Sequence, residues 1–298
     1  MKTLRNLLIL FSLAGCVTDF DTSGLEIPEV YVLNSLITPN EPFSCAIDVA
    51  GKPTDKTYKF VDNADVSMYN AETNALICKL NHTDSGQYIA QTAKPVVGAT
   101  YRIEAIIPNK AILTGQTSIP GKVTPTRAYG HFSGIGIDYD SYYFTGYLEF
   151  ADTEAAEYYE IEIRENTNVR RQHLPFTASE DTIIRKYNAF IYDRQSFMLL
   201  QDEFFKNKPH LFRFQFEKRG NISKPNLIIL RSISFEYYNF LKFWLKHKQE
   251  ETLNLNILNP AQGLLGLFYT PIPIYSNIEG GTGIFAGYNT TVFLSENM

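Results

Sequence analysis

Residues 43–49 read Phe43-Ser44-Cys45-Ala46-Ile47-Asp48-Val49. Apolar side chains occupy every second position of this stretch, and polar or small side chains lie between them. Because side chains alternate between the two faces of an extended chain, the pattern predicts a half-buried β-strand. An earlier apolar run begins at Val30 and ends before the turn signal Thr38-Pro39-Asn40. The two runs therefore predict two consecutive strands.

The same alternation continues over the next seventy or so residues. It returns around Val66, Leu76, Tyr101 and Ile112, and Gly, Pro, Asn and Asp residues separate the stretches. About seven short strands at this spacing are typical of an immunoglobulin-like β-sandwich. We expect that domain over residues 29–122, because Pro120-Gly121 marks a boundary.

Residues 123–298 predict a second, β-rich domain. Strand patterns cover residues 142–150, 157–164, 212–216 and 227–230, whereas residues 166–182 lack periodicity and predict a loop. One α-helix is expected near residues 233–249, where Ile233, Tyr237, Leu241 and Trp244 form an apolar stripe. Ser232 or Ser234 can cap its start. The predicted fold class is therefore mainly β, with an N-terminal immunoglobulin-like β-sandwich followed by a β-rich domain with one prominent helix.

The first residues have the features of an export signal. Lys2 and Arg5 precede a short apolar core, which ends in Leu13-Ala14-Gly15-Cys16. Small residues before a cleavage site are typical of signal peptides, so we expect residues 1–15 to be removed. The tetrapeptide resembles the lipobox of bacterial lipoproteins, which implies lipid on the sulfur and on the new amine of Cys16. Several acyl chains would anchor the protein stably in a membrane. The alternative is an ordinary secretory signal followed by an incidental cysteine.

Residues 16–28 predict a lipidated tether without periodicity. Asp19 and Asp21 lie close to the lipidation site. They resemble the signal that sends lipoproteins of the Bacteroidota to the outer face of the outer membrane. The expected location is therefore the outer membrane, facing the cell exterior. The alternative is that both acids only keep the tether polar.

Composition excludes several classes of protein. The chain has 298 residues, of which 44% are hydrophobic, and 27 basic residues stand against 32 acidic ones. This apolar content excludes a disordered chain, and the negative balance excludes general electrostatic binding to nucleic acid. After residue 15, no apolar run approaches the roughly 18–20 residues that a membrane-spanning helix needs.

The C-terminal half carries a family resemblance. A helix with the pair Tyr237-Tyr238 precedes Asn259-Pro260, and a glycine-rich segment follows near the chain end. This segment reads Ser276-Asn277-Ile278-Glu279-Gly280-Gly281-Thr282-Gly283-Ile284-Phe285-Ala286-Gly287-Tyr288. The pattern resembles a family of Bacteroidota outer-membrane lipoproteins of unknown function, whose genes lie beside genes for TonB-dependent transporters. The resemblance implies an accessory role in uptake or surface assembly, with a transporter as partner.

The glycine-rich segment predicts a structural motif rather than a phosphate loop. Its glycine spacing differs from that of nucleotide-binding loops, and no βαβ unit surrounds it. We expect Gly280, Gly281 and Gly283 to supply backbone geometry that a Cβ forbids. Asn277 and Phe285 belong to the same motif, and Ile284 and Phe285 are expected to pack between the helix and the sheet of the second domain.

No other pattern predicts catalysis, so we expect no enzyme activity, no cofactor and no metal. The five histidines are dispersed without zinc-ligand spacing. Cys45 and Cys78 fall on the apolar phase of their strands, where they are either buried thiols or a disulfide. Carboxylates on distant strands can still form a glycosidase pair. A surface glycan-active hydrolase and a structural or adhesive module therefore remain alternatives.

Charge is segregated along the chain. Residues 206–248 contain ten basic residues and only Glu217 and Glu236 as acids. One interpretation is a basic patch that faces lipopolysaccharide phosphates or an acidic partner. The other, which we favour, is that these charges pair with acids from elsewhere in the fold.

Overall fold

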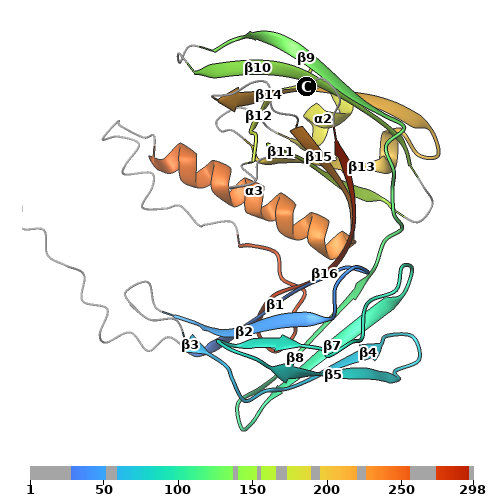
Figure 1. The fold of residues 1–298 in the computed structure, drawn as a ribbon. Coiled ribbons are helices and arrows are strands. Elements are labelled where there is room, and N and C mark those ends of the chain that lie inside the picture. Colours follow the sequence, from blue (N-terminus) through green and yellow to red (C-terminus); the bar gives the residue numbers. More distant parts are fainter. Residues whose placement is uncertain are drawn as a thin grey trace, which may run out of the picture.

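A computed structural model describes residues 28–51, 59–136, 140–152, 156–165, 173–188, 195–219, 226–255 and 273–294. The chain is mainly β, as the sequence predicts, and its strands form two sandwich-like halves (Figure 1). The predicted signal peptide (residues 1–15), Cys16, the predicted tether up to residue 27 and Asn259-Pro260 lie outside the described residues.

The first half is a two-layer sandwich of eight strands in the described part of the chain. Their bounds are β1 Val30–Ile37, β2 Ser44–Ala50, β3 Lys59–Phe60, β4 Asp65–Asn70, β5 Leu76–His82, β6 Gln87–Ile89, β7 Thr100–Ile107 and β8 Ala111–Ser118. Strands β1, β2, β3 and β6 form one layer, and β5, β4, β7 and β8 form the other. A short pairing of β5 with β6 joins the two layers into one hydrogen-bonded sheet.

The alternation of apolar residues explains this sandwich. Leu33, Ile47 and Ile103 are fully buried, whereas the residues next to them in each strand are partly or fully exposed. One apolar face of each layer thus packs against the other and leaves the polar faces outside. The β-sandwich predicted for this half is confirmed.

The second half also has two β-layers. Its strands are β9 Arg127–Ile135, β10 Ser141–Ala151, β11 Tyr158–Glu165, β12 Phe176–Ala178, β13 Phe197–Gln201, β14 Pro209–Arg219 and β15 Asn226–Ile233. Strands β12, β14, β10 and β9 form a four-stranded sheet, which faces β13, β11 and β15. Aromatic rings fill the space between the layers, because Phe150, Phe212, Phe214 and Phe216 all point inward and are fully buried.

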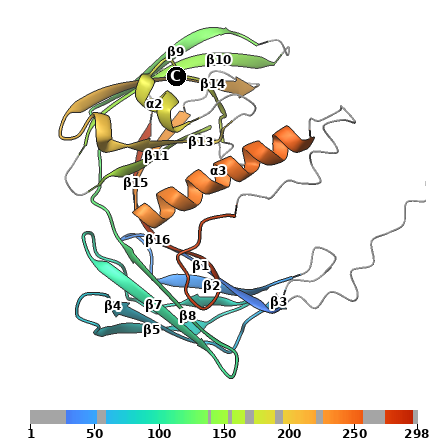
Figure 2. The same cartoon turned by 180° about the vertical axis from the view of Figure 1, so that it is seen from behind.

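The long helix α3 (Phe235–Leu255) confirms the predicted helix. Ser234 caps it, since the N–H of Tyr237 donates to Ser234 Oγ at 3.3 Å. Ser232 does not cap it, and its hydroxyl donates to the carbonyl of Gly121 instead. Tyr238, Leu241 and Leu245 pack against the outer face of β13 and β15. The helix therefore covers this sheet and lies between the two halves (Figure 2).

The last strand, β16 (Thr282–Leu294), connects the two halves. Its first part pairs in parallel with β1, with Phe285 opposite Ser35. Its second part pairs antiparallel with β15, with Tyr288 opposite Ile233. One continuous strand thus belongs to both sandwiches, and Figure 1 shows it running from one half to the other.

Buried polar side chains hold the connection between the halves, where the sequence predicts a domain boundary. Asn289 donates to the carbonyl of Pro120 at 3.4 Å, and Thr291 donates to that of Val123. These bonds satisfy linker carbonyls that lie away from water.

The prediction of a loop over residues 166–182 is wrong in part. Strand β12 lies within it and pairs with β14, and α2 (Thr182–Tyr187) begins at its end. Asp181 caps α2, because its carboxylate accepts from the N–H groups of Ile183 and Ile184. The sequence patterns also predict no strand over the residues of β9, β13 and β16. Among the helices of the described residues, none combines the length and the apolar character that a membrane crossing requires.

Candidate functional site

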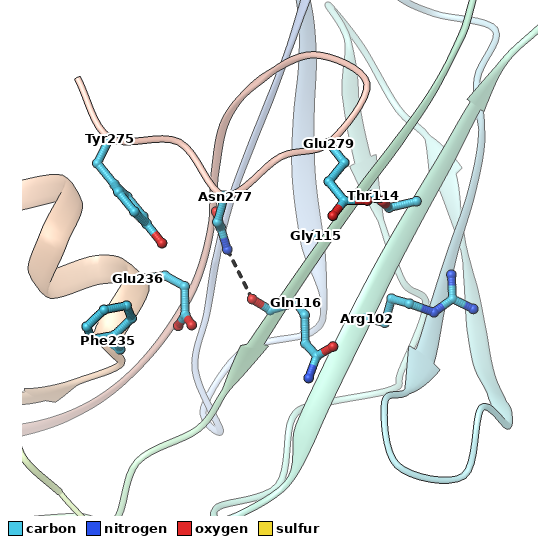
Figure 3. A pocket seen from close by; sticks show the side chains of 9 residues that line it. All are labelled: Arg102, Thr114, Gly115, Gln116, Phe235, Glu236, Tyr275, Asn277 and Glu279. Carbon is cyan, nitrogen blue, oxygen red and sulfur yellow. Dashed lines mark hydrogen bonds between the residues drawn. The ribbon is translucent and has the colours of Figure 1, made fainter. Parts of the chain in front are cut away.

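A cleft of about 290 Å³ opens where the two halves and α3 meet. Three segments far apart in the sequence form its walls: strands β7 and β8, the start of α3, and residues 275–279 (Figure 3). The lining residues are Arg102, Thr114, Gly115, Gln116, Phe235, Glu236, Tyr275, Asn277 and Glu279.

The strand wall comes from outward-facing positions of β7 and β8. Arg102 lies opposite Gln116 in the register of the two strands. The guanidinium of Arg102 donates to Glu104 at 3.0 Å and to Asn74 at 2.8 Å, and it stacks over the ring of Tyr69. These contacts hold the arginine at one end of the cleft and compensate its charge.

The helix wall consists of the first two residues of α3. Phe235 is 53% exposed and its ring lies 5.8 Å from that of Tyr158. Glu236 Oε2 accepts a hydrogen bond of 2.8 Å from Thr117 Oγ1, so strand β8 fixes this carboxylate. A carboxylate in the first turn also interacts favourably with the helix dipole.

The third wall is the segment before β16. Asn277 Nδ2 donates to the carbonyl of Gln116 at 3.0 Å, as drawn in Figure 3. The backbone of Glu279 pairs with that of Thr114 through bonds of 3.1 and 2.8 Å. The hydroxyl of Tyr275 points toward the cleft (Figure 3). Burial, followed by the nearby Glu236 carboxylate, raises the pKa of Tyr275, which keeps the hydroxyl protonated as a donor.

The chemistry of the cleft is that of a polar binding site. Five of the described lining side chains carry planar groups with at least two hydrogen-bonding atoms each, namely Arg102, Gln116, Glu236, Asn277 and Glu279. Two aromatic rings, of Phe235 and Tyr275, complete the walls. Such a site binds a ligand that offers several hydroxyl or amide groups together with an apolar face.

The sequence-predicted motif lies directly beside this cleft. Asn277 lines it, whereas Gly280, Gly281 and Gly283 follow as the chain enters β16. Gly280 has φ +76° and Gly283 has φ +119°, and a Cβ at these positions would overlap the carbonyl oxygens of Ile112 and Leu33. The motif thus sets the path of the chain between the cleft and the first sandwich.

Phe285 is fully buried, but its surroundings differ from the expectation. It belongs to the core of the N-terminal sandwich, together with Ile278, and not to the space between helix and sheet of the second half. Only Ile284, on the opposite face of β16, shares the side of Tyr288, which packs against the α3 cluster. The parallel pairing with β1 causes the difference, because it places Phe285 inside the first sandwich.

No local pattern of the sequence predicts the cleft. Residues 102–116, 235–236 and 275–279 are far apart in the sequence, and the β1–β16 pairing and the packing of α3 bring them together. For Phe235 the sequence offers one indication. This large apolar residue directly follows the helix cap and lies outside the apolar stripe, so the helix does not need it for packing and it can line a surface site.

A second polar feature lies on the α3 side of the sheet. The buried carboxylates of Glu160 and Glu162 share Arg231, whose two Nη atoms lie 2.9 Å from them. Glu162 also contacts Arg164 and His173. Burial raises the pKa of Glu160, although the positive charge of Arg231 opposes this. The cluster neutralises Arg231, one of the ten basic residues of the 206–248 segment.

Four further basic side chains of that segment pair with acids. The pairs are Lys206 with Asp202, Arg213 with Glu180, Lys218 with Glu165 and Arg219 with Glu217. Except for Glu217, all acids in these pairs come from outside the segment. The preferred interpretation, pairing with acids from elsewhere in the fold, is confirmed for Arg213, Lys218 and Arg231, whereas Lys206 and Arg219 pair with acids close to them in the sequence.

The two cysteines of the first sandwich point inward and are free thiols. Cys45 is 3% exposed, and Cys78 packs against the same core from a partly buried position. Burial raises the pKa of Cys45 to about 12. In the described part of the chain, no group of three or more His, Cys, Asp or Glu side chains is placed to hold a metal ion.

Fold and site define a β-sandwich protein whose two halves share a strand and enclose a polar cleft beside a single long helix. A family model described as a domain of unknown function, DUF4249, matches residues 17–293, and the chain belongs to this family. No curated protein matches the chain.

Proposed function

We propose that this protein is a non-enzymatic lipoprotein of the bacterial outer membrane, anchored through lipid on Cys16 and facing the cell exterior. In this proposal it acts as an accessory or partner of a TonB-dependent transporter, in uptake or in surface assembly. The observation that carries the proposal is the sequence Leu13-Ala14-Gly15-Cys16 directly after a charged and apolar leader. The family match begins at residue 17, directly after that cysteine.

The side chains of the cleft support a binding role over a catalytic one. Asn277 and the backbone of Glu279 are engaged in bonds that hold β8 to the C-terminal segment. Glu236 is fixed by Thr117. Groups that already serve the fold present a rigid surface to a ligand or partner.

The proposal that the partner is a transporter rests on the resemblance to lipoproteins whose genes lie beside transporter genes. The test is affinity purification of the full chain with a C-terminal tag from detergent-solubilised membranes of its own host. We expect a TonB-dependent transporter in the eluate. Its reproducible absence, with the bait itself recovered, would contradict the proposal.

A matched bait separates a specific partner from membrane proximity. Residues 1–28 fused to an unrelated soluble domain should reach the same membrane through the same lipid. A transporter that binds the described fold is enriched with the full chain and not with this fusion. Equal recovery with both baits would show that only the shared anchor brings the transporter down.

A surface glycan-active hydrolase is the alternative, since Glu236 and Glu279 line the same cleft. Two carboxylates that face each other across a sugar ring can act as acid and as base or nucleophile. Release of reducing ends from polysaccharides, lost in both Glu236→Gln and Glu279→Gln, would favour this alternative. Activity that persists in both variants would come from elsewhere.

A further inference from the structure

We propose that the cleft between the two halves is a binding site for a neutral saccharide. The inference goes beyond the role as a transporter partner, because it rests on the lining of the cleft and not on the anchor or the partner. It names the class of ligand that an exposed site of this chemistry recognises.

The hydrogen-bonding groups of the cleft match a ligand rich in hydroxyl groups. A sugar hydroxyl donates one hydrogen bond and accepts others, so its site needs donors and acceptors close together. Glu236 and Glu279 supply acceptors, Tyr275 supplies a donor, and the side-chain amide of Gln116 supplies both. Planar groups can bind two neighbouring hydroxyls of one ring at once.

The aromatic residues supply the apolar part of such a site. Phe235 is 53% exposed although it is a large apolar residue at the start of a packed helix. The ring of Tyr275 stacks with that of Phe243, and the ring centroids lie 6.4 Å apart. A pyranose has an apolar face of C–H groups, and an exposed ring next to polar groups can cover that face.

The charge of the cleft favours a neutral ligand over an acidic one. Among the described lining residues, two carboxylates, Glu236 and Glu279, stand against one guanidinium, that of Arg102. Glu104 already compensates this guanidinium at 3.0 Å. Phosphates or uronic acids would therefore meet a net negative charge from the described lining residues.

The walls of the cleft are held before any ligand arrives. The Glu236–Thr117 bond, the Asn277–Gln116 bond and the Glu279–Thr114 backbone pairing fix its three segments to strand β8. Fixed polar groups lose little conformational freedom on binding, which favours recognition of a weakly binding sugar. A cleft of about 290 Å³ lies at the lower end of ligand-site sizes and fits a sugar unit rather than a large ligand.

The test is isothermal titration of the purified full-length protein in detergent with maltose, cellobiose and lactose, and with digalacturonic acid as acidic comparison. We expect at least one neutral disaccharide to bind with a Kd of about 1 mM or lower, and digalacturonic acid to bind at least about tenfold more weakly. Absence of binding by all three neutral probes up to about 10 mM would overturn the proposal, as would equal binding of the acidic probe.

Two substitutions locate the site. Gln116→Ala and Phe235→Ala should each weaken binding by about five- to tenfold, because each removes one contact type from the ligand. The matched controls are Gln87→Ala on β6 and Phe132→Ala on β9, which remove exposed side chains outside the cleft. Unchanged affinity in both cleft variants would overturn the assignment to this cleft.

The result of the sugar titration does not depend on whether a transporter binds the protein. If sugar binds and no transporter co-purifies, the saccharide site stands and the partner role fails. If a transporter co-purifies and no sugar binds, the reverse holds. Cleavage of a bound disaccharide would support the saccharide site and overturn the non-enzymatic role.

Discussion

Asn277 satisfies both backbone groups of Phe285 with one side chain. The N–H of Phe285 donates to Asn277 Oδ1 at 2.9 Å, and Asn277 Nδ2 donates to the carbonyl of Phe285 at 2.8 Å. The amide thus occupies the edge of β16 that faces away from β1, where no strand of the described residues pairs with this part of β16. The same Nδ2 reaches the carbonyl of Gln116 on β8.

The next residue on this edge is satisfied in the same way. The N–H of Gly287 donates to the hydroxyls of Thr117 and Ser234, at 3.1 and 3.3 Å. The carbonyl of Gly287 accepts from the N–H of Ser234 at 2.9 Å. Side chains from both halves therefore complete the hydrogen bonding of the first part of β16. From Tyr288 onward, pairing with β15 provides these hydrogen bonds.

Asn277→Ala should lower the free energy of unfolding by about 2–4 kcal/mol, because it leaves the N–H and carbonyl of Phe285 without partners. Asn277→Asp should be at least as damaging, since a carboxylate cannot donate to the two carbonyls. Urea unfolding followed by circular dichroism measures the change. The control is Asn81→Ala at an exposed position of β5, and equal effects of both alanine variants would contradict the structural role.

Gly283→Ala should cost about 3 kcal/mol or more, or prevent folding. The residue has φ +119°, and a Cβ there would overlap the carbonyl oxygen of Leu33 on β1. Gly134→Ala is the matched control, because nothing lies within 4 Å of its Cβ position. The expected order of thermal melting temperatures is wild type and Gly134→Ala together, with Gly283→Ala far below them. A melting temperature of Gly283→Ala near that of the control would refute the strained geometry.

Local periodicity accounts for what the sequence predicted well. Alternation identifies a strand such as β2 because one face of it is buried, and the apolar stripe of α3 identifies the helix for the same reason. Short elements such as β12 and α2 carry too few residues for a period to emerge. For α2, the cap at Asp181 was the available signal.

Long-range pairing accounts for what the sequence did not predict. Ser35 and Phe285 lie side by side in parallel strands although most of the chain separates them. Parallel pairing has no turn that marks it in the sequence, and its register follows from both strands together. The cleft depends on this pairing, so the positions of its lining residues could not be derived from local patterns.

Phe285→Ala should destabilise the protein by about 3–5 kcal/mol, since a large side chain is removed from a closed core. Its core is that of the first sandwich, where Gly115 and Ile278 lie beside it. Phe132→Ala removes the same side chain from a site that is 49% exposed and should cost less than about 1 kcal/mol. A thermal melt compares the two. If Phe285→Ala kept the melting temperature of the wild type but lost binding to a partner, the glycine-rich segment would be a partner-binding loop and Phe285 would not be a core residue.

Cys16→Ser should release the protein from the membrane without unfolding it, because the lipid on Cys16 is the proposed anchor. Fractionation of cells, with a high-salt wash of the membranes, measures the soluble share. Circular dichroism of the released variant should match that of the wild type. A variant that stays in the membrane fraction after the wash would show that a protein partner supplies the anchorage.

Cys45 should resist alkylation in the native protein, whereas Cys78 should react more readily. Burial raises the pKa of Cys45 to about 12. At pH 8 only about one thiol in 10,000 is then a thiolate, and the thiolate is the reactive form. Cys78 is only partly buried, which gives the reagent access. The measurement is iodoacetamide labelling with peptide mass mapping, before and after unfolding in guanidinium chloride. After a short exposure, the native sample should carry label on Cys78 but not on Cys45, and the unfolded sample should carry label on both. A Cys45–Cys78 disulfide peptide in the non-reduced digest would contradict the free thiols and support the alternative of a covalent bridge between the two layers.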